Sequence, residues 1–125
     1  MEEWEEEFDW LKVRHYIKDT FGKAQLPDLN AILFVIGLQE LGTLQTKFSK
    51  EQKQDLMHIA VCKLLSFDGI YGLKGIDADG WPHYELLQPI ASKGVKEQEI
   101  LLKKKIIQYF NILENQNTAD EEIIL

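Results

Sequence analysis

The sequence predicts one mainly α-helical domain over residues 1–125, with four helices and one β-hairpin between the third and the fourth helix. Two observations support this α+β class. Four segments repeat apolar residues at helical spacing, and Asp79-Gly80 separates two runs of aromatic and branched residues. Hydrophobic residues make up 45% of the chain, which is enough to bury a core and argues against disorder.

The first helix is predicted from Glu3 to Phe21 and carries two apolar stripes on nearly opposite sides. One stripe consists of Trp4, Phe8, Leu11 and His15, and the other of Trp10, Val13, Ile17 and Phe21. A surface helix needs only one apolar face. The second face is therefore either covered within the same domain or kept for another chain.

The second helix is predicted to begin at Pro27 and Asp28 and to end at Gly42. Residues 31–38 are apolar almost all round, so a buried strand is the alternative that periodicity alone does not exclude. The polar flanks favour a helix that forms the core. Gly37 within it is a candidate for close helix approach.

The third helix is predicted to start at the S-x-x-Q capping box of Ser49 and Gln52 and to end near Phe67. Its broad apolar face consists of Leu56, Met57, Ala60, Val61, Leu64 and Leu65. Its other side carries Glu51, Asp55, His58 and Cys62. That grouping resembles part of a metal site, but no second ligand motif accompanies it, so we expect a solvated polar face with a half-exposed Cys62 and no metal or cofactor.

Residues 70–87 are predicted to form the hairpin, with its turn at Asp79-Gly80. Pro82 is expected to make the start of the second strand irregular. The Asp77-x-Asp79-Gly80 sequence fails the calcium-loop pattern at both ends, so we expect a tight turn. Trp81, His83 and Tyr84 either pack onto the helices or form a recognition surface.

The last helix is predicted from Val95 to about Leu113, followed by a flexible acidic tail at residues 114–125. Its apolar seam consists of Val95, Leu102, Ile106, Tyr109 and Leu113. The spacing is that of a short coiled coil. This seam is either used by the core or shared with a second copy of the chain.

The net charge of −7 arises at the two ends of the chain, because residues 1–9 and 114–125 contain ten acids and no base. Acidic ends are typical of solvated segments. With a single cysteine no disulfide framework is expected, which indicates a reducing compartment, the cytoplasm. No apolar run reaches the ~18–20 residues of a membrane span, and the acidic N-terminus does not resemble a signal peptide.

The function that the sequence favours is that of a small soluble, non-enzymatic interaction protein. The chain has no phosphate loop, nucleophile elbow or metal quartet, so no catalytic or cofactor site is predicted. We expect a homodimer or contact with an unidentified protein partner. The candidate interaction residues are Trp81, His83, Tyr84, Trp10, Val13, Ile17, Leu102, Ile106 and Tyr109.

The alternative function follows from a resemblance in layout. The run Leu64-Leu65-Ser66-Phe67-Asp68-Gly69-Ile70, followed by Asp79-Gly80 and Tyr84-Glu85-Leu86, is similar in rhythm to a recognition helix that leads into a wing. Over about residues 28–113 the element order resembles a winged-helix domain followed by a dimerisation helix, which implies DNA binding. A recognition helix presents lysine and arginine side chains to DNA. This helix presents Glu51 and Asp55 instead, so nucleic acid is the disfavoured partner.

Overall fold

The computed structural model describes residues 3–41, 45–90 and 94–124, with side chains described from residue 5 to residue 115 within these ranges. It contains helix α1 (Glu3–Thr20), α2 (Leu29–Glu40) and α3 (Lys50–Ser66). Strands β1 (Tyr71–Ile76) and β2 (Pro82–Leu86) follow, and then helix α4 (Val95–Ile124). The predicted fold class, four helices with one hairpin between the third and the fourth, is confirmed.

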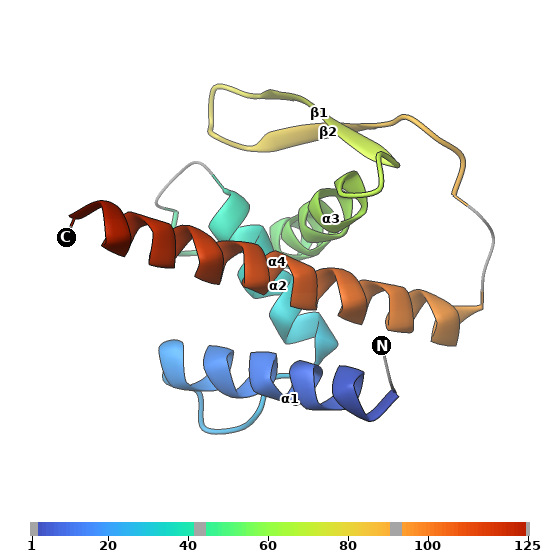
Figure 1. The fold of residues 1–125 in the computed structure, drawn as a ribbon. Coiled ribbons are helices and arrows are strands. Elements are labelled where there is room, and N and C mark those ends of the chain that lie inside the picture. The colour runs from blue at the N-terminus through green and yellow to red at the C-terminus, as the bar shows by residue number, and fades with distance from the viewer. Residues whose placement is uncertain (1–2, 42–44, 91–93, 125) are drawn as a thin grey trace.

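The elements are arranged around the long helix α4, which crosses the middle of the molecule (Figure 1). Helix α1 lies on one side of α4 and the hairpin lies on the opposite side, beyond α3. Helices α1 and α4 run in the same direction. Glu6 near the start of α1 pairs with Lys104, and Tyr16 near its end stacks edge-on against Phe110 at 5.9 Å.

Side-chain caps fix the starts of α2 and α3, as the sequence predicts. The Asp28 carboxylate accepts a hydrogen bond from the Ala31 N–H at 2.9 Å. Ser49 Oγ accepts from the Gln52 N–H at 3.1 Å, and Gln52 Oε1 accepts from the Ser49 N–H at 3.0 Å. Each cap satisfies backbone donors that the first helical turn leaves without a partner.

The main core lies where α1, α2, α3 and α4 meet. Among its buried side chains are Val13 and Ile17 from α1, Ile32 and Ile36 from α2, and Ile106 and Tyr109 from α4. Trp10 and Leu102 are partly buried against the same cluster. The prediction that Val13, Ile17, Ile106 and Tyr109 belong to an interaction surface is therefore wrong, because the chain buries these side chains in its own core.

Helices α2 and α3 approach closely at Gly37, as the sequence suggested. A Cβ placed on Gly37 would lie 2.7 Å from the carbonyl carbon of Leu56 and closer still to its oxygen. The missing side chain thus lets the backbone of α3 rest against α2. The segment Leu29–Glu40 is a helix, which settles the helix-or-strand alternative.

The hairpin is antiparallel, and Gly80 adopts the left-handed conformation in its turn with a φ of 87°. Pro82 pairs with Ile76 at the start of β2. The irregularity expected at Pro82 lies instead in β1, where the register shifts between Leu73 and Gly75. Both strands are sheet edges, so Pro82 can sit in β2 without removing a ladder hydrogen bond from a further strand.

Helix α4 extends beyond the predicted end at Leu113 and reaches Ile124, so the acidic segment continues the helix. Lys105 of α4 pairs with Asp68 at 2.6 Å, which ties the helix to the end of α3. Among the described residues, none of the helices combines the length and the apolar character that crossing a membrane requires.

Candidate functional site

The strongest candidate site is the solvent-facing side of α1, which we call the outer face. It consists of Phe8, Leu11 and His15, and their exposed fractions include 63% for Phe8 and 42% for Leu11. These residues form the stripe opposite Val13 and Ile17, which point into the core. Val13 and Ile17 of the second predicted stripe are therefore inside the fold, whereas Phe21, which follows the end of α1, is exposed. The side chain of Trp4, the remaining member of this stripe, lies outside the described side chains.

The inner side of α1 is held in place by α4. Lys104 pairs with Glu6 at 3.5 Å, and the Lys103 ammonium lies 5.4 Å from the centre of the Trp10 ring. Arg14 donates from Nε to the carbonyl oxygen of Pro27 at 2.8 Å, which fixes the chain that leaves α1. These contacts all lie on the side of α1 that faces the fold, so the outer face is turned to solvent.

The predicted hairpin residues divide between the interior and the surface. Trp81 and Tyr84 are half-buried and pack against the second cluster of the core, which consists of Leu41, Leu56 and Ile59. The Trp81 ring also meets Phe48 edge-on at 6.3 Å. Of the two alternatives for these aromatic residues, the structure shows docking onto the helices.

His83 is exposed at the tip of the hairpin and pairs with Asp77 at 2.8 Å. The other carboxylate oxygen of Asp77 accepts from the backbone N–H groups of Asp79 and Trp81. The hydrogen bond from His83, followed by the bond from the Trp81 N–H, lowers the pKa of Asp77 from its usual value. Asp77 therefore organises the turn, and its histidine partner adds to this role.

The hairpin also carries exposed apolar side chains that the sequence did not point to. Leu73, Ile76 and Leu86 are more than half exposed and lie opposite Tyr84, Pro82 and Tyr71 in the ladder. Directly opposed residues share one face of the ladder, so these three lie at the margins of the face that packs on α3. The period-two pattern of β2 was the available signal, since Pro82, Tyr84 and Leu86 alternate with His83 and Glu85.

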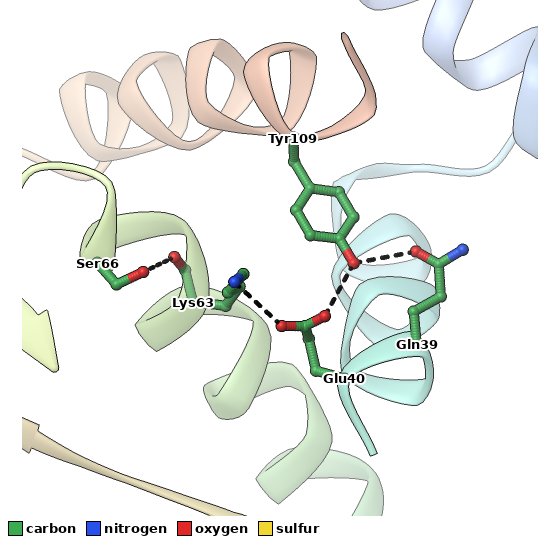
Figure 2. Close-up of polar contacts among 5 residues, drawn as sticks. All are labelled: Gln39, Glu40, Lys63, Ser66 and Tyr109. Carbon is green, nitrogen blue, oxygen red and sulfur yellow. Dashed lines mark hydrogen bonds and ion pairs between the residues drawn. The ribbon is translucent and has the colours of Figure 1, made fainter. Parts of the chain in front are cut away.

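A polar cluster joins the ends of α2 and α3 to the middle of α4 (Figure 2). The Tyr109 hydroxyl lies 3.2 Å from both Gln39 Oε1 and Glu40 Oε2, and Lys63 lies 3.5 Å from the other oxygen of Glu40. Burial, and then the charge of Glu40, raise the pKa of Tyr109. The same two causes raise the pKa of Tyr84 to about 12. Both phenols therefore stay protonated, and that of Tyr109 donates to Glu40 and Gln39.

The cluster has a structural role at the end of α2. Glu40 is the last residue of that helix, where the negative end of the helix dipole disfavours a carboxylate. Lys63 and the Tyr109 hydroxyl offset this cost by giving the charge partners on two neighbouring helices. Sequence reasoning placed Tyr109 on an apolar seam and missed this polar contact, because the partners are about 70 residues apart in the chain.

The four potential metal ligands predicted on one side of α3 differ in their exposure to solvent. Glu51, Asp55 and His58 are exposed, whereas Cys62 is only 1% exposed, so the expectation of a half-exposed thiol is wrong. Both strands of the hairpin pack against α3, and Tyr84 of β2 lies close enough to Cys62 for the two groups to interact electrostatically. Burial raises the pKa of Cys62 to about 11. Among the described residues, no three His, Cys, Asp or Glu side chains are grouped as a metal site requires.

An open groove lies between the end of α2 and the start of α3. It has a volume of about 730 Å³, and its walls include Phe34, Leu38 and Phe48, with Lys47 and Lys53 also lining it. Phe34 and Phe48 meet edge-on at 6.3 Å within the second cluster of the core. The groove is thus a shallow extension of the core surface rather than an enclosed ligand cavity.

Comparisons of this chain with models of known protein families, with curated proteins and with solved structures find no match.

Proposed function

We propose that this chain is a small non-enzymatic interaction protein that self-associates as a homodimer. The observation that supports the proposal is the outer face of α1, where Phe8 and Leu11 stay exposed although Val13 and Ile17 on the opposite side of the same helix are buried. Burying apolar area contributes about 25 cal/mol per Å². A large exposed aromatic residue within such a stripe is a common anchor of protein interfaces.

Three further features agree with a binding role. The first of them, the state of the cysteine, also agrees with a reducing compartment, which we propose to be the cytoplasm. The single cysteine is a buried thiol without a disulfide. The carboxylate of Asp77 is engaged in turn hydrogen bonds. The buried phenol of Tyr109 binds Glu40 and Gln39 within the fold. Cys62, Asp77 and Tyr109 therefore serve the fold, and the apolar surface of α1 remains available for a partner.

The test is the mass of the chain in solution. Sedimentation equilibrium across micromolar concentrations is expected to show a species of twice the 14.6 kDa chain mass, in exchange with the monomer. A chain that remains a monomer throughout this range would contradict the proposal.

DNA binding is the second candidate function, and one observation favours it. Helix α3 follows α2 closely and packs against both strands of the hairpin, which is the layout of a recognition helix beside a wing. The exposed residues of α3 include Glu51 and Asp55, so the surface chemistry disfavours this candidate. Retention on duplex DNA that falls steeply with added salt would support it over the interaction protein.

A further inference from the structure

We infer that the outer face of α1 is the homodimer interface, and that two copies of α1 pair there in antiparallel orientation about a two-fold axis. This inference rests on the proposed self-association and names the surface and the geometry that produce it. Three features favour a second copy of this chain as the occupant of the outer face. They are the charges of α1, the positions of its apolar residues and its location in the fold.

The location of α1 leaves room for a second molecule. Helix α1 lies along one side of the molecule, with α2 and α4 on its inner side, and none of the other helices and strands that the structure describes lies beyond it (Figure 1). The helix has 18 residues, which corresponds to a length of about 27 Å. A pair of such helices buries an area at the low end of specific interfaces, so we expect a dimer that dissociates in the micromolar range.

The charges of α1 are separated along its length. The half from residue 3 to residue 10 contains five acids and no base, namely Glu3, Glu5, Glu6, Glu7 and Asp9. The half from residue 11 to residue 20 contains Lys12, Arg14 and Lys18 with one acid, Asp19. In antiparallel pairing, the acidic half of each copy lies beside the basic half of the other. Parallel pairing would place the two acidic halves together, which like-charge repulsion disfavours.

Three of these charged side chains remain available for a second copy. Glu5 and Lys12 lie on one flank of the apolar stripe and Glu7 lies on the other, as the helical spacing of 100° per residue places them. Within the part of the chain that the structure describes, none of the three forms an ion pair. Glu6, by contrast, points to the inner side and pairs with Lys104.

The apolar and charged positions agree on one register. An axis that passes between Phe8 and Leu11 places Phe8 of one copy against Leu11 of the other, and symmetry repeats this contact. The same register brings Glu5 within about two residues of Lys12 of the second copy, on the same flank. Charge complementarity and apolar contact therefore select the same arrangement.

The experiment uses charge reversal and rescue in the full chain, by sedimentation equilibrium at one fixed ionic strength. The first variant carries Glu5→Lys and Glu7→Lys, and the second carries Lys12→Glu and Lys18→Glu. Each variant alone places like charges across the interface, so we expect the dimer dissociation constant to rise about tenfold or more. An equimolar mixture joins a basic helix to an acidic helix, so it is expected to form the heterodimer.

Two controls separate the interface from general effects. Glu51→Lys with Glu85→Lys changes the net charge as the first variant does, at exposed positions of α3 and β2, and is expected to dimerise as the unmodified chain does. Phe8→Gln with Leu11→Gln removes the apolar contact from exposed positions, and is expected to give a folded monomer by circular dichroism and sedimentation.

The possible failures are distinguishable. An unmodified chain that is monomeric overturns both the proposed self-association and this interface. An unmodified chain that dimerises while the reversed and Gln variants dimerise equally well overturns the interface alone. Reversed variants that stay monomeric when mixed overturn the antiparallel charge match.

Discussion

Gly37 of α2 faces the backbone carbonyl of Leu56 in α3 so closely that no side chain fits between them. Both helices carry core residues on the surrounding positions, because Ile36 and Leu56 are each fully buried. The relative position of α2 and α3 therefore depends on a residue without a Cβ. Since the hairpin rests on α3, this contact also supports the second cluster of the core.

Replacing Gly37 by Ala is expected to lower the free energy of unfolding by about 1–3 kcal/mol, because the backbone of α3 must move away from α2. The measurement is urea unfolding followed by circular dichroism. Gly75→Ala is the control, since a Cβ at Gly75 meets no atom within 4 Å, and we expect a change within about 0.5 kcal/mol. A Gly37→Ala chain as stable as the control would contradict the close approach.

Replacing Tyr109 by Phe is expected to cost about 1 kcal/mol of unfolding free energy, because Glu40 and Gln39 lose the phenol donor at a site where Tyr109 is buried. The matched control is Tyr16→Phe, which removes the hydroxyl of an exposed tyrosine and leaves its ring contact with Phe110. Thermal and urea unfolding of both variants provide the comparison. Equal losses in the two variants would show that the Tyr109 hydroxyl contributes nothing specific.

Replacing Asp77 by Ala is expected to loosen the tip of the hairpin, because the backbone N–H groups of Asp79 and Trp81 lose their side-chain acceptor. Hydrogen exchange of these two amides is expected to accelerate, while the amides of α2 keep their protection. Asp79→Ala is the control, since the carboxylate of Asp77 and not that of Asp79 accepts these bonds. Faster exchange in both variants would indicate a general effect of the turn sequence.

The same turn is expected to depend on acid pH. Because the pKa of Asp77 is lowered in the fold, its stabilising contribution is present above the unfolded pKa, near 3.8, and is lost as the pH falls through the lower folded value. The Trp81 amide signal in NMR spectra should therefore shift with a midpoint below 3.8. Asp77→Asn is expected to abolish this transition, and a midpoint at or above 3.8 would contradict the hydrogen-bonded turn.

Cys62 is expected to resist alkylation in the folded chain. Its thiol is 1% exposed and burial raises its pKa to about 11, so both access and the thiolate fraction are low. Reaction with a neutral alkylating reagent near pH 8 should be slow in buffer and fast in denaturant. Labelling at the same rate in both conditions would contradict the packing of the hairpin over α3.

The sequence by itself determined the secondary structure closely, where local chemistry decides it. Asp28 and Ser49 begin their helices through side-chain caps, and Asp79-Gly80 turns the hairpin, as predicted. These features depend on hydrogen bonds and backbone preferences within a few residues. Gly37 was also identifiable, although its partner Leu56 was not.

The tertiary structure decided which side of each element is inside. Helix α1 offered two apolar stripes, and only packing against α2 and α4 shows that Val13 and Ile17 are buried while Phe8 and Leu11 remain exposed. Cys62 was predicted on the polar side of α3, yet the folded chain buries it. Burial depends on elements that are distant in the chain, and a helical repeat records only the spacing of apolar residues and not what faces them.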